Sequence, residues 1–391
     1  MLNIHFVTRV RGFFSHLLHN NDIIANITVP SNKVYEVNNK LIKVKNKIGR
    51  SWIFDLIGYI QILKCNDTYA DIYASSNRFL HTKKPYFIYI ENPTGLFHYQ
   101  LKRVNNFFGR RTIQRELNSK KLCGLVFMSR ACESTFETVC YRVPTHIHTA
   151  QIYPLVPLNR SINNTLIEEK CKQEELKLLF VSQGTFFRVK GGIEVLEAFD
   201  FLRKRGFNIS LEIITKIHDL EPEIKSRILM TEGIILNDFN YSYPQLEVEY
   251  FKNHVLLSPT SMDSFSLTVL EAMKSGMVVI ASRLYAIPEM VKEGINGYLC
   301  DPQFWFFDRN NIPNPKVWNH RKETVFSSQI SSEIISFLCD KISLLYKDRI
   351  LLTEMSIKSY SIASQPPFSE EYITKQWNDF FTIISTNIDD K

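Results

Sequence analysis

Short apolar runs alternate with longer amphipathic stretches along most of the 391 residues of this chain. In the first half the strand-like runs lie at 3–8, 22–27, 70–75, 86–91, 124–129 and 146–154. Amphipathic stretches at 54–65 and 110–121 separate some of them and predict helices. This alternation favours a parallel sheet with helices packed on its faces.

A second and more regular series of the same kind begins at residue 176. Its expected strands are 176–183, 209–215, 233–238, 254–259 and 277–282, and its expected helices are 191–206, 243–253 and 266–276. Gly206 and Gly276 stand at helix ends, where a positive φ is wanted. After an insertion at 301–327, helical patterns return at 332–348, 349–364 and 370–386.

The length of the chain exceeds what one hydrophobic core usually organises. We therefore expect an α/β protein with two doubly wound, Rossmann-like domains that face each other across a cleft. The predicted domains are residues 1–168 and 169–367, and the C-terminal helix at 368–391 is predicted to complete the first domain. A tract with two prolines and many polar residues, 154–175, predicts the linker between them.

The cysteines and the apolar segments indicate the cellular compartment in which the protein is expected. The seven cysteines are scattered without zinc-type spacing, so neither a disulfide framework nor a structural metal is expected. The first residues lack the pattern of a signal peptide, and the apolar segments are too short to span a bilayer. We expect a cytoplasmic protein that uses no metal or other cofactor.

The net charge of +7 is unevenly distributed. Residues 1–168 carry 22 Lys and Arg against 10 Asp and Glu, whereas the remainder is acidic. Basic clusters at 40–50, 102–103 and 110–111 interleave with aromatic residues, which favours an anionic partner such as a phospholipid surface or a phosphorylated glycan. Ordinary solvated faces are the alternative. No nucleic-acid recognition motif is present, so nucleic acid is not an expected partner.

The stretch SPTSMDSFSLTVLEAMKSG, residues 258–276, places two carboxylates with seven residues between them, Asp263 on a loop and Glu271 in a helix. Backbone N–H groups at Phe265, Ser266 and Leu267 would begin that helix and suit a diphosphate. Glu271 would lie about 7.5 Å further along the axis, where a carboxylate could hold a ribose. Alternatively, Asp263 or Ser264 is an N-cap and Glu271 is a solvated helix residue.

A second stretch, LLFVSQGTFFRVKGGIEVLEAF at 178–199, places Arg188 and Lys190 in a loop before a helix that starts at Gly191 and Gly192. Two fixed cations beside a helix start favour an anion, and they would stabilise a diphosphate as it leaves. The alternative is that Lys190 is simply exposed at the helix start.

These two stretches, with IPEMVKEGINGYL at 287–299, resemble the C-terminal domain of retaining GT-B glycosyltransferases of the family-four type, the glycosyl transferases group 1. The resemblance is strong over 176–300 and only topological over 1–170. It implies a nucleotide-diphosphate-sugar donor such as a UDP-sugar, retention at the anomeric carbon, and no essential metal. Lys190 matches the phosphate-binding lysine and Glu271 the ribose-binding glutamate of that family.

The resemblance also carries over further residues, with departures. Phe265, Ser266 and Leu267 match the segment whose backbone meets the phosphates, and Arg188 stands in for an arginine that the family places earlier, near Gln183 and Gly184. Asp263 replaces the first glutamate of the family motif and is one methylene shorter. The Gly-Gly loop after the first strand is reduced to Gly12.

The acceptor side is expected in the first domain, along 86–100. Glu91 follows a strand and would orient an acceptor hydroxyl or cap the loop, and His98 would face the transferred sugar or simply pack. Asp263, Arg188, Lys190 and His98 are the predicted catalytic residues.

The predicted activity is transfer of a sugar to a glycan or lipid-linked acceptor in cell-surface polysaccharide synthesis, at the inner face of the membrane as a peripheral protein. An inactive GT-B-like binding or scaffold protein and a nucleotide-sugar epimerase are the alternatives. A nicotinamide oxidoreductase is not expected, because no G-x-G-x-x-G occurs.

Overall fold

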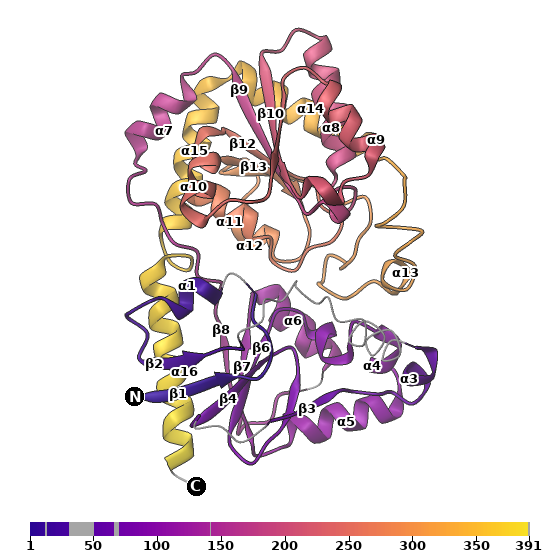
Figure 1. Ribbon diagram of the computed structural model, residues 1–391, viewed down its shortest axis with the longest axis vertical. Coiled ribbons are helices and arrows are strands. Elements are labelled where there is room, and N and C mark those ends of the chain that lie inside the picture. Colours follow the sequence, from indigo (N-terminus) through magenta and orange to yellow (C-terminus); the bar gives the residue numbers. More distant parts are fainter. Residues whose placement is uncertain (12–13, 31–50, 66–69, 141, 390–391) are drawn as a thin grey trace. The chain divides into compact units, whose positions relative to one another are not determined.

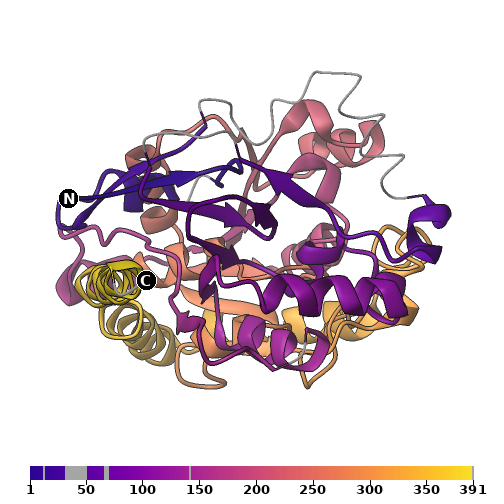
Figure 2. The ribbon, with the colours of Figure 1, turned by 90° about the horizontal axis from the view of Figure 1, so that it is seen from below.

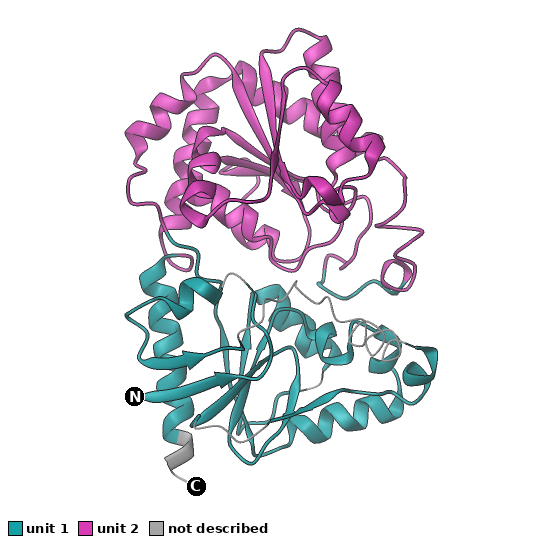
Figure 3. Ribbon diagram, in the orientation of Figure 1, with its two compact units in different colours: residues 1–157, 310–315, 369–391 teal, residues 158–309, 316–368 magenta. Residues whose placement is uncertain are grey.

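The computed structural model describes the backbone of residues 1–11, 14–30, 51–65, 70–140 and 142–389, and side chains as far as residue 386. The chain forms two compact units (Figures 1 and 3). Unit 1 contains residues 1–157, 310–315 and 369–391, and unit 2 contains residues 158–309 and 316–368. The predicted cluster at 40–50 lies outside the described residues.

Unit 1 is built on a parallel sheet whose strands agree with the expected first series. Its central strands β6 (Tyr86–Ile90) and β7 (Leu122–Phe127) are buried along their whole length, as strands covered on both faces must be. In spatial order the strands are β2 (Ala25–Thr28), β1 (Leu2–Phe6), β4 (Ile72–Ser76), β6 (Tyr86–Ile90), β7 (Leu122–Phe127) and β8 (His148–Gln151).

The helices of unit 1 lie between these strands, and the last helix of the chain joins them. They are α1 (Phe14–Leu18), α3 (Trp52–Leu56), the 3-10 helix η1 (Pro93–Phe97), α4 (Leu101–Val104), α5 (Phe107–Leu117), α6 (Arg130–Val139) and α16 (Glu370–Asp389). α16 crosses β1 and β2 in the view of Figure 1 and is seen end-on in Figure 2.

Aromatic side chains hold α16 against the sheet of unit 1. Trp377 stacks on Tyr89, and Phe380 lies edge-on to Phe87, with ring centroids 6.0 and 5.3 Å apart. Gly124 of β7 makes room for this packing, because a Cβ there would lie 2.7 Å from the Phe380 ring. The far C-terminal segment therefore belongs to the core of unit 1.

The helix expected at 54–65 is wrong over most of its length. α3 ends at Leu56, and the chain then turns at Gly58, whose φ is +61°. Residues 62–64 form a short strand, β3 (Ile62–Lys64), which pairs in parallel with β5 (Phe79–His81). A glycine that adopts the left-handed conformation stops a helix even where the amphipathic pattern continues.

Unit 2 repeats the doubly wound plan with a second parallel sheet. In spatial order its strands are β11 (Ile234–Asp238), β10 (Ile209–Thr215), β9 (Leu176–Val181), β12 (Val255–Ser258), β13 (Val278–Ser282) and β14 (Gly297–Cys300). Its helices are α7 (Asn164–Cys171), η2 (Gly184–Phe186), α8 (Gly192–Lys204), η3 (Ile217–Asp219), α9 (Pro222–Met230), α10 (Tyr243–Lys252), α11 (Leu267–Lys274), α12 (Ile287–Met290), α13 (Pro315–Trp318), α14 (Ser332–Lys347) and α15 (Arg349–Ser364).

The helices of unit 2 that were not expected from the sequence include α9 and α7. α9 fills the connection between β10 and β11, where the prediction had no helix, and it buries Ile224 and Ile228. α7 lies inside the tract predicted as a linker, and it buries Ile167 and Cys171 in the core of unit 2. For this reason unit 2 begins at residue 158 rather than at 169.

Candidate functional site

The strand order of unit 2 identifies where a ligand should bind. From β9 the chain passes to β10 and β11 on one side of the sheet, and β12 then lies on the other side of β9. Parallel α/β sheets bind ligands at the carboxyl ends of the two strands where the order reverses. The loops that follow β9 and β12 carry the cations and the carboxylate predicted from the sequence.

These two loops are fastened to each other. The N–H of Ser261 donates to the carbonyl of Val189 at 2.9 Å. Gly191 has φ +79°, and a Cβ there would lie 2.5 Å from the Pro259 carbonyl oxygen. The glycine that starts α8 therefore serves both the left-handed conformation and the close approach of the second loop.

Lys190 and Asp263 meet where the loops join. Lys190 Nζ lies 2.5 Å from Asp263 Oδ2 and also donates to the carbonyl of Met262 at 3.3 Å. Burial alone would raise the pKa of Asp263, but the Lys190 ammonium and the backbone N–H donors lower it below its usual range. The pair is thus a charged pair at the mouth of the sheet, with both side chains partly accessible.

Asp263 also caps its own loop. Its Oδ1 accepts the N–H groups of Ser264, Phe265 and Ser266 at 2.8, 3.3 and 3.0 Å. Asp263 therefore holds the turn before α11, but it is not the helix N-cap that the alternative expected, because that position is Ser266. The expectation that the N–H groups of Phe265 and Ser266 are open to a diphosphate is wrong for this structure, because Asp263 already accepts them.

The start of α11 has an unusual backbone. Ser266 is buried and adopts a left-handed conformation, with φ 67° and ψ 72°, and the helix begins at Leu267. Phe265 is buried in the same turn. Non-glycine residues rarely adopt this conformation, and where they do the turn is commonly part of a ligand site. Leu267 contributes the first helical N–H.

Arg188 does not join Lys190 and Asp263. Its guanidinium makes a bidentate pair with Glu221, with Nε–Oε1 and Nη2–Oε2 distances of 2.9 and 2.8 Å. The hydrogen bonds from Arg188 lower the pKa of Glu221. Glu221 was missed from the sequence, because it lies 33 residues away, just before α9.

Glu271 is held by a buried tyrosine of the neighbouring helix. Tyr250 of α10 donates its hydroxyl hydrogen to Glu271 Oε2 at 2.8 Å. Burial raises the pKa of Glu271 to about 7, whereas the Tyr250 hydrogen bond acts in the opposite direction. Glu271 is therefore a half-buried, hydrogen-bonded side chain rather than a freely solvated one. Nothing in the sequence pairs Tyr250 with Glu271.

The acceptor-side candidates belong to unit 1. Glu91 follows β6 and is buried, and its carboxylate accepts from Ser76 Oγ at 3.2 Å and lies 2.8 Å from Arg11 Nε. Its own N–H donates to the Asn77 side chain. His98 follows η1 in a left-handed conformation, with φ 58°. Gly12 lies outside the described residues.

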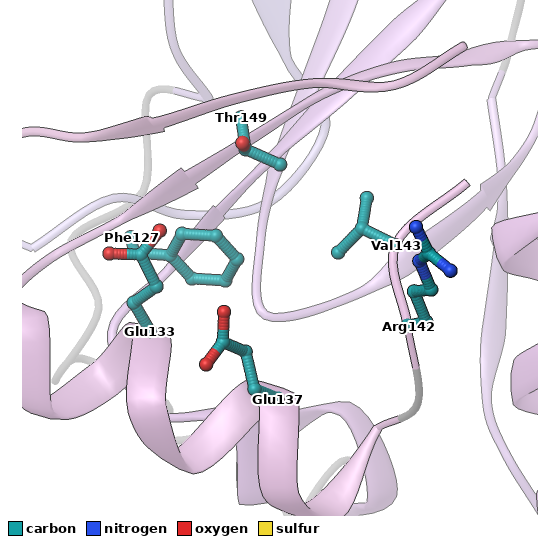
Figure 4. Close-up of a pocket in the computed structure, with 6 residues that line it drawn as sticks. All are labelled: Phe127, Glu133, Glu137, Arg142, Val143 and Thr149. Carbon is teal, nitrogen blue, oxygen red and sulfur yellow. The ribbon is translucent and has the colours of Figure 1, made fainter. Parts of the chain in front are cut away.

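A separate cavity of about 420 Å³ lies beside α6 in unit 1 (Figure 4). Glu133 and Glu137 project from the helix toward it, and Arg142 lies across from them. Phe127, Val143 and Thr149 complete its lining. The residues that line this cavity include none of the predicted site residues.

The described residues contain no group of three or more His, Cys, Asp or Glu side chains that could hold a metal ion. The helices among them include none that is both long and apolar enough to cross a bilayer.

Two Rossmann-like units in one chain define the GT-B fold, and comparison with solved structures confirms it. A structure of Anabaena Alr3699/HepE in complex with UDP-glucose matches with a TM-score of 0.62 and 14% identity, over 98% of this chain and 100% of that one. A glycosyltransferase from Rickettsia africae matches with a TM-score of 0.59 and 14% identity, over 99% of each chain.

Sequence comparison matches part of the second unit to a known family. Residues 164–305 match the model of the family described as "Glycosyl transferases group 1". An uncharacterised 41.2 kDa protein from the cps region of Klebsiella pneumoniae is 29% identical over 165 residues, which is 40% of this chain and 42% of that relative. The predicted resemblance is thus confirmed: unit 2 carries a glycosyl transferases group 1 segment within a GT-B fold. The chain spans less than half the length of this curated relative.

Proposed function

We propose that this protein is a retaining glycosyltransferase, which transfers a sugar from a nucleotide-diphosphate-sugar to an acceptor hydroxyl. The observation that carries the proposal is the Lys190–Asp263 pair at the switch point of a sheet within the group 1 segment. A cation and a carboxylate are thus placed at the sheet edge where this type of fold binds its ligands.

The donor site would use this pair in two parts. The donor diphosphate would form an ion pair with the Lys190 ammonium in place of Asp263. Asp263 Oδ2, released from this cation, would accept hydrogen bonds from hydroxyl groups of the sugar. Asp263 Oδ1 would keep the loop capped. Glu271 would accept from the ribose hydroxyls. The solved complex of the Anabaena protein with UDP-glucose supports a UDP-sugar as the donor.

Arg188 would contribute the second cation after exchanging partners. Its bidentate pair with Glu221 is partly open to solvent, with 26% and 53% of the two side chains exposed. Exposed pairs contribute only about 0–1 kcal/mol, so a diphosphate could displace Glu221 at little cost. With Lys190, this cation would balance the charge that develops on the leaving diphosphate. We propose that the protein's own cations balance this charge and that no metal is required.

The transfer itself would depend on positioning. The acceptor hydroxyl would attack from the face that the diphosphate leaves, and the departing phosphate oxygen would take its proton. Glu91 and His98 of unit 1 are the proposed acceptor-side residues. In the present structure Glu91 is paired with Arg11 and Ser76. It would therefore act either by holding the loop that follows β6 in place or by exchanging one of these partners for the acceptor.

The Klebsiella relative encoded in a cps region supports a role in cell-surface polysaccharide or lipid-linked glycan synthesis. We propose a cytoplasmic enzyme that works at the inner face of the membrane, where nucleotide-sugars are available.

The test is a panel of nucleotide-sugars incubated with cell-envelope extract as acceptor, with products identified by mass spectrometry. Replacing Lys190 or Glu271 by Ala should reduce transfer at least ~100-fold, as loss of a transition-state contact does. Lys204→Ala removes an exposed lysine at the end of α8 and is the matched control.

The outcomes separate the alternatives. Binding of a nucleotide-sugar without transfer or hydrolysis would indicate a scaffold, and conversion of the donor without acceptor would indicate an epimerase. Transfer that is unchanged in Lys190→Ala and Glu271→Ala would overturn the donor site.

A further inference from the structure

Helix α3 exposes its apolar side chains instead of burying them. Trp52, Ile53, Leu56 and the following Ile57 are each more than half exposed. All five residues of α3 are described, and none of them is buried. A short helix whose large apolar side chains face solvent indicates a contact with something outside the unit.

The start of α5 extends this surface. Phe107 and Phe108 are also more than half exposed, with ring centroids 5.6 Å apart. Asn106 joins the two helices, because its side-chain amide donates to the Leu56 carbonyl and its Oδ1 accepts the Phe108 N–H. We call Trp52, Ile53, Leu56, Ile57, Phe107 and Phe108 the apolar face.

A buried frame holds the apolar face in place. Arg103 is fully buried, and its Nε lies 2.7 Å from Asp55 Oδ1 of α3. Gly58 and Gly109 allow the two backbones to touch, since a Cβ on Gly58 would lie 2.4 Å from the Gly109 nitrogen. The face is therefore a fixed feature of unit 1. Arg103 belongs to this frame and not to the surface, which corrects the expectation that the 102–103 pair is a basic surface cluster.

The segments that carry the apolar face, residues 51–57 and 102–111, are basic apart from Asp55. Lys102, Arg110 and Arg111 are exposed beside it. In the sequence, residues 51–65 and 98–115 include only one acidic residue, Asp55, and the buried Arg103 pairs with it. Aromatic and aliphatic side chains flanked by Lys and Arg suit a bilayer with anionic headgroups.

We propose that the apolar face docks unit 1 on an anionic phospholipid bilayer. Trp52, Phe107 and their apolar neighbours enter the interfacial region, and Lys102, Arg110 and Arg111 contact the headgroups. Trp in particular favours this interface. The proposal identifies an anionic bilayer as the partner that would hold the protein at the peripheral location proposed above. It rests on residues of unit 1 alone, so it can be disproved without affecting the proposed donor site in unit 2.

The first test is sedimentation of the full chain with vesicles. Phosphatidylglycerol vesicles should bind the protein at least ~10-fold more tightly than phosphatidylcholine vesicles. The double variant Trp52→Ser/Phe107→Ser should lose that binding. Phe201→Ser/Ile350→Ser, which removes two exposed apolar side chains of unit 2, is the matched control and should bind like the wild type. Equal binding by both double variants would overturn the proposal.

A second test places the contact at Trp52. Phosphatidylglycerol with brominated acyl chains should quench the tryptophan emission of the wild type and quench that of Trp52→Phe much less. No difference in quenching would overturn the proposal. A dimer in light scattering that Trp52→Ser/Phe107→Ser dissociates, without any lipid binding by the wild type, would show that the face is covered by a second copy instead.

Discussion

At the residue scale, the two carboxylate oxygens of Asp263 make different contacts. Oδ1 accepts three backbone N–H groups of its loop, and Oδ2 holds Lys190. This division explains how a residue can cap a turn and still remain a candidate for binding sugar hydroxyls. It also means that removing the side chain changes the fold and the chemistry together.

Two substitutions of Asp263 separate these roles. Asp263→Ala should lower the free energy of unfolding by about 1–2 kcal/mol, because the loop N–H groups lose their acceptor. Asp263→Asn keeps an acceptor oxygen and should lose less than half as much, yet it should bind donor poorly because the charge that orients Lys190 is gone. Chemical denaturation and calorimetry with UDP-glucose measure the two effects. Equal destabilisation by Ala and Asn would contradict the capping role.

If Glu271 binds the donor as proposed, donor binding should depend on pH. Its pKa of about 7 is raised by burial, so the carboxyl is largely protonated below pH 7 and ionised above it. If the ionised form accepts the ribose hydroxyls, affinity for UDP-glucose should increase as pH rises through about 7. Titration calorimetry between about pH 5.5 and 8.5 checks this, because the diphosphate of a UDP-sugar does not titrate in that range.

Variants of this pair should move the pH profile in known directions. The Tyr250 hydrogen bond lowers the pKa of Glu271, so Tyr250→Phe should shift the midpoint to higher pH. Glu271→Gln cannot ionise and should bind weakly with a flat profile. The same midpoint in wild type and Glu271→Gln would rule out Glu271 as the titrating group.

At the element scale, Lys170 of α7 ties two helix ends together. Its buried ammonium donates to the carbonyls of Asn253, Ser275 and Gly276, which follow α10 and α11. Burial lowers the pKa of Lys170 to about 8, so it stays mainly protonated at neutral pH. A cation at the C-terminal ends of helices is favourable, and here one lysine serves both.

Lys170→Met should therefore destabilise the protein by about 2–4 kcal/mol, because three buried carbonyls lose a charged donor. The neighbouring Lys172 is exposed, and Lys172→Met is the control, with an expected change below about 0.5 kcal/mol. Thermal or urea unfolding measures both. If the two variants have the same stability, α7 is held by its apolar side chains alone.

At the scale of the whole molecule, two parallel sheets repeat one plan, and the chain passes between the units more than once. Residues 310–315 belong to unit 1 although they interrupt unit 2 in the sequence, and residues 369–391 belong to unit 1 although they follow unit 2. Thr135 Oγ1 of α6 donates to the Asn311 carbonyl, and the aromatic side chains of α16 pack on β6 and β7. Unit 1 is thus completed by one segment that lies within unit 2 in the sequence and by another that follows unit 2.

Much of the fold could be predicted from the sequence, because it depends on local patterns. Alternating strands and helices define the two sheets, and Gly206 and Gly276 do adopt positive φ. The departures are also local: Gly58 ends α3 early, and the apolar spacing of Ile167 and Cys171 marks α7 inside an apparent linker. Both signals are present in the sequence. The apolar spacing in α7 was outweighed by the polar composition around it, and Gly58 by the amphipathic pattern that continues past it.

The sequence by itself determined the doubly wound plan, the group 1 resemblance and the loops that carry Lys190 and Asp263. Backbone periodicity and chain spacing are enough for this, because parallel strands bring their carboxyl ends to one edge. Only the tertiary structure decided which partners those side chains take: Arg188 with Glu221, Glu271 with Tyr250, and Asp263 with Lys190. The physical reason is that hydrogen bonds and ion pairs are made between side chains far apart in the chain, and packing chooses among many possible partners.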